Sequence, residues 1–173
     1  MSDHSPAARA TASSVTADVS AVFGALIEEA CAGATDPAST WITDQGSDHG
    51  LLGVCRGLSA EAASLAAGGG HSIAGHVNHV AFGLEFLRAA AERRKPEGDW
   101  AASWSPEQVD ELQWQACLAR LRAAIDGMKA TLAGVETWDE VRLKAAISAA
   151  AHSAYHLGVV RAHVARLRAG GAR

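Results

Sequence analysis

The sequence predicts an all-α protein built as a four-helix bundle, and three observations lead to this fold class. Four long segments carry apolar residues at the spacing of helical turns. No segment shows the apolar–polar alternation that is typical of a half-buried strand. Turn-forming residues separate the four segments, so each predicted helix has its own start and stop signals. Four long helices without strands are expected to pack as a bundle.

The first helix is predicted over residues 13–31, because apolar residues recur there at helical spacing: Val15, Val19, Val22, Leu26 and Ala30. Gly33 and Pro37 are expected to end it. Residues 34–71 are rich in turn-forming residues and are expected to hold one or two short helices. Ser59 is a candidate start for one of them, and the following GGGH stops it.

The second long helix is predicted over residues 72–94, with Ser72 as its N-cap. Its apolar seam consists of Ile73, Val77, Val80, Leu84 and Leu87. The third is expected to open with Ser105 as N-cap, Pro106 in the first turn and Gln108 completing a capping box. It ends near Gly134, and the fourth helix follows over residues 138–168.

The composition is that of one globular domain. The chain has 173 residues, of which 49% are hydrophobic and 20% charged, so it is long enough to bury a core. The formal net charge of −4 predicts no basic face, so no nucleic-acid partner is expected. Charged residues interrupt the apolar runs, so neither a membrane-spanning segment nor a membrane partner is expected.

The first residues, MSDHSPAARATASS, lack the apolar core of a signal peptide. We therefore expect a cytoplasmic protein with a flexible N-terminal leader at 1–12 and a single helical domain at 13–170. The three cysteines lie far apart, and no CxxC pair occurs. This pattern predicts free thiols that are buried as small apolar side chains.

The fourth helix carries the clearest chemical signal, in the stretch SAAAHSAYHLGVVRAH. His152 and His156 are four residues apart, so on a helix their imidazoles lie on one side and about 6 Å apart along the axis. Two such side chains can converge on one metal ion. His163 lies about 10 Å further along the helix, so it is expected at the helix end or the rim of a pocket.

A third ligand is expected from the second helix, which contains HSIAGHVNHVAFGLEF. His76 and His79 are both candidates, and the helical periodicity slightly favours His76 as the inward group. Neutral imidazoles suit Zn²⁺, Ni²⁺, Fe²⁺ and similar ions. Three protein ligands leave an open position for water or substrate, as in catalytic zinc sites. Histidines on a helix also occur as hydrogen-bonded core residues, so a structural role stays open.

These two stretches, SIAGHVNHVAFGLEFL and AAHSAYHLGVVRAH, together resemble the DinB/YfiT-like family of metal-dependent four-helix-bundle proteins. The resemblance extends over nearly the whole chain after residue 15. It implies His79, His152 and His156 as the metal ligands, with His76 as the second choice for the helix-two position. It also implies an up-down-down-up bundle, with a long crossover at 95–105, and a homodimer.

Three functions follow as hypotheses. The resemblance implies a metalloenzyme that holds one divalent transition metal ion (Zn, Ni, Fe or Mn, with Zn or Ni expected in a purified sample). Such an enzyme would act on a small-molecule substrate, as an S-transferase using a low-molecular-weight thiol or as a hydrolase. The second hypothesis is a non-catalytic, stress-linked metal-binding or dimeric interaction module. The third is a plain helical structural domain in which the histidines are coincidental.

Several further residues have two interpretations each. Arg161 could anchor an anionic substrate or be a solvated charge, and Glu85 is expected at the surface rather than behind an imidazole. Trp100 and Trp104 could wall a cleft or seal the end of the bundle. His49 lies in a predicted loop and is a weak candidate for a lid residue. Gly158 indicates either close helix packing or a tolerated accident.

Overall fold

The computed structural model describes residues 6–44, 48–66 and 70–170. Within these ranges the chain forms helices and no strand, with one isolated β-bridge between Ala66 and Ser72. The all-α class predicted from the sequence is therefore confirmed. The elements in order are α1 (Pro6–Ala32), α2 (Leu51–Cys55), α3 (Ala60–Ala63), α4 (Ile73–Ala91), the 3₁₀-helix η1 (Ala102–Trp104), α5 (Glu111–Ala133) and α6 (Glu140–Gly170).

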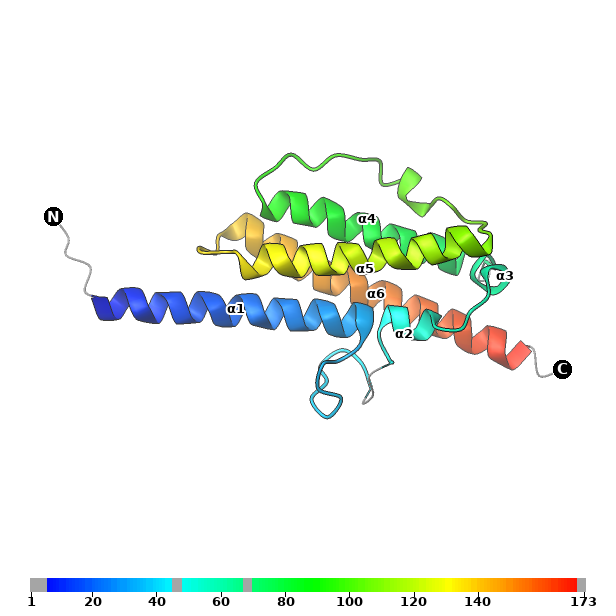
Figure 1. Ribbon diagram of the computed structural model, residues 1–173, viewed down its shortest axis with the longest axis horizontal. Coiled ribbons are helices and arrows are strands. Elements are labelled where there is room, and N and C mark those ends of the chain that lie inside the picture. Colours follow the sequence, from blue (N-terminus) through cyan, green and yellow to red (C-terminus); the bar gives the residue numbers. More distant parts are fainter. Residues whose placement is uncertain (1–5, 45–47, 67–69, 171–173) are drawn as a thin grey trace.

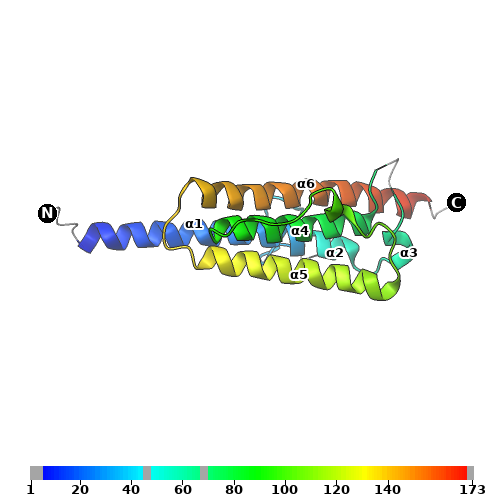
Figure 2. The ribbon, with the colours of Figure 1, turned by 90° about the horizontal axis from the view of Figure 1, so that it is seen from above.

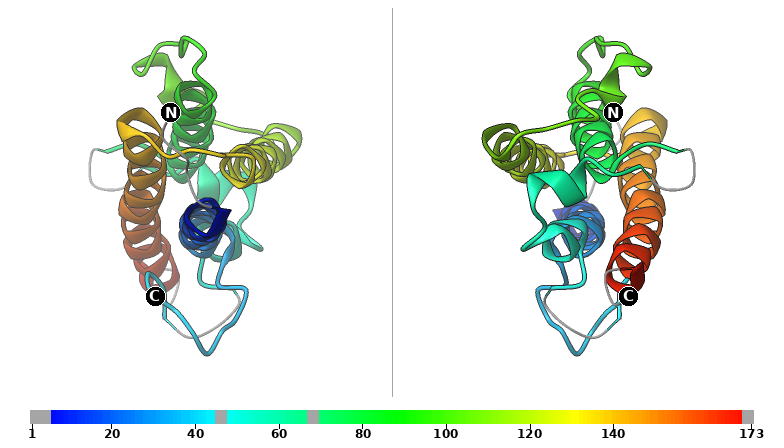
Figure 3. Two further views of the ribbon diagram at one scale, coloured as in Figure 1. Left: turned by 90° about the vertical axis from the view of Figure 1, so that its left-hand side faces the viewer. Right: turned by 90° about the vertical axis from the view of Figure 1, so that its right-hand side faces the viewer.

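The long helices α1, α4, α5 and α6 lie side by side along the molecule (Figures 1 and 2). In Figure 1, α1 and α6 run from left to right, whereas α4 and α5 run from right to left. Seen end-on, α4 contacts both α5 and α6, and α1 contacts the same two helices from the other side (Figure 3). The segment between α4 and α5 returns along the outside of α4, because these neighbouring helices run in the same direction.

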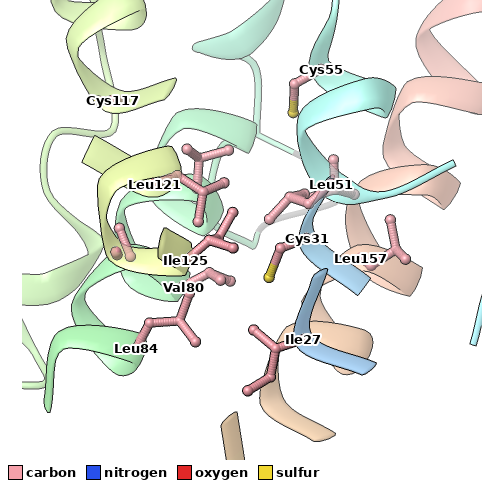
Figure 4. Packing of buried hydrophobic residues seen from close by; sticks show 14 of the residues in the cluster. Ile27, Cys31, Leu51, Cys55, Val80, Leu84, Cys117, Leu121, Ile125 and Leu157 are labelled. Carbon is pink, nitrogen blue, oxygen red and sulfur yellow. The ribbon is translucent and has the colours of Figure 1, made fainter. Parts of the chain in front are cut away.

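The core lies between these four helices and α2. Figure 4 shows apolar side chains from five helices pointing toward one another, among them Ile27, Leu51, Val80, Ile125 and Leu157. Their burial supplies the main favourable term for the packing of the bundle. All three cysteines are free and buried, as the sequence predicts. None of the helices in the described ranges is long and apolar enough to cross a membrane.

Two of the predicted helix starts agree with the structure. Ser72 caps α4, and its Oγ accepts a hydrogen bond of 3.0 Å from the backbone N–H of Gly75. Ser59 caps α3 in the same way, with a bond of 3.2 Å from Ala62. Each side chain satisfies one of the backbone donors that the first turn of a helix leaves without an intrahelical partner.

The predicted start of the third long helix is wrong. The helix α5 begins at Glu111, and its capping box consists of Asp110 and Gln113 rather than Ser105 and Gln108. The reason is tertiary, because the Gln108 side chain instead donates a hydrogen bond of 2.8 Å to the carbonyl oxygen of Ser64. The chain therefore crosses the end of the bundle in a non-helical conformation before α5 starts.

The helix α1 begins at Pro6, seven residues before the predicted start at 13, and its N-terminal half extends past the other long helices (Figures 1 and 2). The first five residues of the predicted leader lie outside the described ranges.

The connection that follows α1 is tied to it by the buried carboxylate of Glu29. This carboxylate accepts hydrogen bonds from the backbone N–H groups of Trp41, Ile42 and Thr43 at 2.7–3.1 Å. Burial alone raises the pKa of Glu29, but these hydrogen bonds outweigh it and hold the pKa below its usual value.

Candidate metal centre

Three histidines from two helices meet in the interior of the bundle. The structure brings His79 of α4 together with His152 and His156 of α6, and one ring nitrogen of each lies within 4.8 Å of the others. His79 is 7% exposed and His156 is 3% exposed. Ligands of one tetrahedral ion, at metal–nitrogen distances of 2.0–2.1 Å, lie about 3.3 Å apart. Small side-chain adjustments would therefore suffice for the three nitrogens to reach a common ion.

The pair on α6 shows the geometry expected for histidines four residues apart. The Nε2 atoms of His152 and His156 lie 3.0 Å from each other. The imidazole of His152 also packs against α4 at Gly83, where a Cβ would lie 2.8 Å from its Cε1 atom and 2.9 Å from its Nδ1 atom. This close approach requires a glycine at position 83. The helix α4 therefore contributes both a histidine and a space for the histidine of the neighbouring helix.

His76, the alternative inward residue of α4, is also buried but does not belong to the three-histidine group. Its Nδ1 atom lies 2.9 Å from Nδ1 of His156. His156 thus has a histidine beside each of its ring nitrogens, His76 at Nδ1 and His152 at Nε2. Of the two candidates from the second helix, His79 thus belongs to the three-histidine group, and His76 lies beside it in contact with His156.

The electrostatics of the cluster favour neutral imidazoles. Burial, followed by repulsion from neighbouring imidazoles, lowers the pKa of His79 to about 4 and that of His156 to about 3. Burial likewise lowers the pKa of His152. At neutral pH these side chains therefore keep the lone pairs that a metal ligand needs. The donor set of three neutral nitrogens fits a divalent transition metal ion.

Aromatic rings form one wall of the site. The Trp104 ring lies between His79 and His71, parallel to both within 8°, at centroid distances of 3.7 and 3.8 Å. The Trp100 ring lies 5.5 Å from His79 and 6.0 Å from His152. Of the two roles considered for these tryptophans, the structure places both beside the histidines rather than at a bundle end.

The connection that carries these tryptophans is anchored by polar contacts. Ser103, between them, lies with its Oγ atom 2.6 Å from Nδ1 of His79. Asn78 donates a hydrogen bond of 2.8 Å to the Ser103 carbonyl oxygen and accepts one of 2.5 Å from Arg120. Arg120 also forms two hydrogen bonds with Glu85, at 3.0 and 2.6 Å. Glu85, expected as a plain surface charge, thus belongs to this supporting network.

The remaining candidates lie outside the group. His163 is buried further along α6, and its Nδ1 atom has no hydrogen-bond partner in the described part of the chain. His49 does not belong to the three-histidine group, and its Nδ1 atom lies 2.9 Å from the Asp44 carbonyl oxygen in the loop before α2. Arg161 forms an ion pair with the Asp44 carboxylate. A Cβ at Gly158 would meet nothing within 4 Å, so close packing does not explain that glycine.

The cysteines offer no reactive thiol at this site. Burial raises the pKa of Cys31 and of Cys55 to about 12, so neither is a thiolate at neutral pH. Any thiol chemistry at the three histidines would need a thiol supplied from outside the chain.

Sequence reasoning missed Ser103, Gly83 and Asn78. Gly83 gave a usable signal, because it lies four residues, about one helical turn, after His79 in an otherwise strong helix. Asn78 lies directly before His79 and gave no such signal. Ser103 carried no comparable signal in the connecting segment.

No protein-family model, curated protein or solved structure matches this chain.

Proposed function

We propose that this chain is a metal-binding protein in which His79, His152 and His156 hold one divalent transition metal ion with an open coordination position. The observation that carries the proposal is the convergence of three imidazole nitrogens within 4.8 Å, from the buried His79 and His156 and the half-buried His152. Burying a polar side chain costs free energy unless its polar atoms have a hydrogen-bond or metal partner. Three such side chains at ligand spacing therefore favour an ion over coincidence.

The proposal includes membership of the DinB/YfiT-like four-helix bundles with up-down-down-up topology. The resemblance in the two histidine-containing helices supports it. The opposed directions of the two helix pairs and the long return between α4 and α5 (Figure 1) are what such a topology would require.

We propose that the site serves a metalloenzyme, as an S-transferase with a low-molecular-weight thiol or as a hydrolase. A bound ion with an open position lowers the pKa of a bound water or thiol toward neutrality. The chain's own residues would position the ion and exclude water, through Trp100 and Trp104 on one side. Zinc or nickel is the ion expected in a purified sample.

One observation favours the non-catalytic alternative. Among the described residues, no carboxylate, lysine or tyrosine forms a hydrogen bond with His79, His152 or His156. A general acid or base would therefore have to come from the substrate or from the ion-bound group itself. A metal-binding or interaction module needs no such residue.

The first test is metal content by elemental mass spectrometry on tag-free protein. We expect about one ion per chain, and its loss in His152→Ala and in His156→Ala. His49→Ala is the matched control, because it removes a histidine outside the group and should retain the ion. An absence of metal in the wild type, with no uptake of added Zn²⁺, Ni²⁺ or Mn²⁺, would refute the metal site and leave a structural role.

The enzyme form is tested separately on the metal-loaded protein. Low-molecular-weight thiols are combined with an aryl halide, and simple esters are assayed for hydrolysis. We expect a rate that disappears on chelation and in His156→Ala. An ion with no exchangeable water and no metal-dependent rate would favour the non-catalytic module instead.

The homodimer also remains a proposal. Exposed apolar side chains on α6 support it: Leu143 is 37%, Ile147 54% and Tyr155 67% exposed. Burial of such side chains against a second copy would be favourable. Sedimentation analysis should give twice the monomer mass, and Ile147→Glu should shift the protein to the monomer.

A further inference from the structure

An imidazole ligand needs a lone pair on the nitrogen that faces the ion and a proton on the other nitrogen. The hydrogen-bond partner of that second nitrogen decides which tautomer is present. The surroundings of His79 and His156 contain such partners. Whether each partner can donate or only accept a hydrogen bond restricts the tautomer of the histidine beside it.

The tautomer of His79 follows from Ser103. The Ser103 Oγ atom lies 2.6 Å from the Trp100 carbonyl oxygen, which can only accept, so the hydroxyl donates its proton there. The same Oγ lies 2.6 Å from Nδ1 of His79. With its one proton already donated, Oγ can only accept in this second contact. Nδ1 of His79 therefore carries the proton, and Nε2 carries the lone pair.

Ser103 is itself held in place by surrounding contacts. The residue is 4% exposed and lies in η1, and its backbone carbonyl oxygen accepts the hydrogen bond from Asn78. Asn78 in turn is held by Arg120 on α5. Ser103 is therefore held beside His79 by Asn78 of α4, which is in turn held by Arg120 of α5.

The tautomer of His156 follows from its two histidine neighbours. A neutral imidazole has one N–H group and one lone pair. If Nε2 of His156 faces the ion together with Nε2 of His152, both of these nitrogens need lone pairs. The proton of His156 then lies on Nδ1, where it is donated to Nδ1 of His76 at 2.9 Å. His76 accepts this bond and keeps its own proton on Nε2.

We propose that Ser103 and His76 are positioning residues that set the tautomers of His79 and His156, so that both present Nε2 to the ion. The contact with Ser103 sets the tautomer of His79 without an ion, whereas the assignment of His156 and His76 rests on the proposed metal site. His76 is thus assigned to support a ligand rather than to replace one. It contacts Nδ1 of His156, whereas His152 lies at Nε2, and it is not part of the three-histidine group.

The first experiment is long-range ¹H–¹⁵N correlation spectroscopy on metal-free, histidine-labelled protein. We expect His79 as the Nδ1–H tautomer in this metal-free protein, and His76 as the Nε2–H tautomer once zinc has been added. In Ser103→Ala, His79 should lose its strong preference for Nδ1–H. Ser153→Ala is the matched control, since it removes another buried serine hydroxyl, next to His152 in the chain, that forms no hydrogen bond with a histidine. His79 as Nε2–H in the wild type would overturn the assignment.

The second experiment measures zinc affinity by competition with a chromophoric chelator. Loss of a partner that orients a histidine ligand typically weakens metal binding 10–100-fold, and we expect this of Ser103→Ala and His76→Leu. His76→Gln should recover most of the affinity, because its carbonyl oxygen can accept the same hydrogen bond. Unchanged affinity in both Ser103→Ala and His76→Leu would overturn the proposal.

Cobalt(II) spectra separate a positioning residue from a ligand. If His76 supports His156, His76→Gln should keep the absorption envelope of the wild type. A spectrum that reports one nitrogen ligand fewer would make His76 a ligand and overturn the assignment. A wild-type protein that binds neither zinc nor cobalt, with His79 as the Nδ1–H tautomer, would instead refute the proposed metal centre and uphold only the hydrogen bond between His79 and Ser103.

Discussion

At the scale of single residues, Gly83 shows how a position without a functional group shapes a site. Glycine in the middle of a helix costs about 0.5–1 kcal/mol relative to alanine, yet α4 carries one directly after the turn that holds His79. The position of His152 explains it, because the imidazole occupies the volume of the missing Cβ. The glycine lowers the stability of the helix α4, but it allows His152 of α6 to approach α4 more closely.

Gly83→Ala is therefore expected to weaken zinc binding by about tenfold or more, because the new methyl group displaces the His152 ring. Gly158→Ala is the matched control on α6. A Cβ there meets nothing within 4 Å, so this variant should bind zinc normally and unfold at a higher denaturant concentration. Equal zinc affinity in the two variants would show that Gly83 does not shape the site.

The buried imidazoles also predict how stability depends on pH in the metal-free protein. Burial lowers the pKa of His156 to about 3 and that of His76 and His79 to about 4, whereas an unfolded histidine titrates near 6.5. Between these values the unfolded chain binds more protons than the folded one. The free energy of unfolding therefore falls as the pH is lowered through this window.

We expect the free energy of unfolding to fall by about 1 kcal/mol or more between pH 7.5 and pH 5, measured by urea denaturation with a chelator present. His156→Leu should reduce this dependence. Glu29 contributes only at lower pH, because its pKa is lowered and its unfolded value is already about 4.3. A pH-independent unfolding free energy across this range would contradict the shifted histidines.

At the scale of elements, the start of α5 is decided by competition for side chains. Local sequence predicts a capping box at Ser105, whereas a second one, at Asp110, is found in the structure. Only the second forms, because Glu107 and Gln108 are engaged by other parts of the fold. A carboxylate oxygen of Glu107 accepts a hydrogen bond of 2.7 Å from the backbone N–H of Ser72, and Gln108 donates to the Ser64 carbonyl.

Removal of the capping side chain distinguishes the two sites. Asp110→Ala should lower the free energy of unfolding by about 1 kcal/mol, the usual effect of losing an N-cap. Ser105→Ala should change it by less than about 0.5 kcal/mol, as expected away from such a feature. Both are measured by denaturant unfolding. A larger decrease in the free energy of unfolding for Ser105→Ala than for Asp110→Ala would indicate that the helix starts at Ser105, as local sequence predicts.

At the scale of the whole molecule, the three histidines connect two helices that belong to opposite-running pairs, α4 and α6 (Figure 1). An ion held there would link the helices across the core. Because the unfolded chain does not hold the three nitrogens together, binding would favour the folded state by about 2.7 kcal/mol at a zinc concentration 100 times the dissociation constant.

Zinc is therefore expected to raise the melting temperature of the metal-free protein by about 5–10 °C under these conditions. The measurement is a thermal melt followed by circular dichroism, with and without zinc. His152→Ala is the variant that should lose the increase, while His49→Ala should keep it. An equal increase in all three proteins would indicate unspecific binding.

The choice between His76 and His79 illustrates the limit of local pattern. The two residues are three apart, or about 60° around the helix, and both prove to be buried. Helical periodicity alone could not separate them, because the answer depends on where α6 lies. The resemblance favoured His79, and His79 is the one within reach of His152 and His156.

The sequence by itself determined the all-helical class, the positions of the long helices, the cap at Ser72 and the pairing of His152 with His156. These properties depend on spacing along one helix or on neighbouring residues, so local rules describe them. Only the tertiary structure decided the start of α5, the place of His76 behind His156, and the contact of Ser103 with His79. Each of these depends on which distant segments are packed together, since the same side chain has different partners in different surroundings.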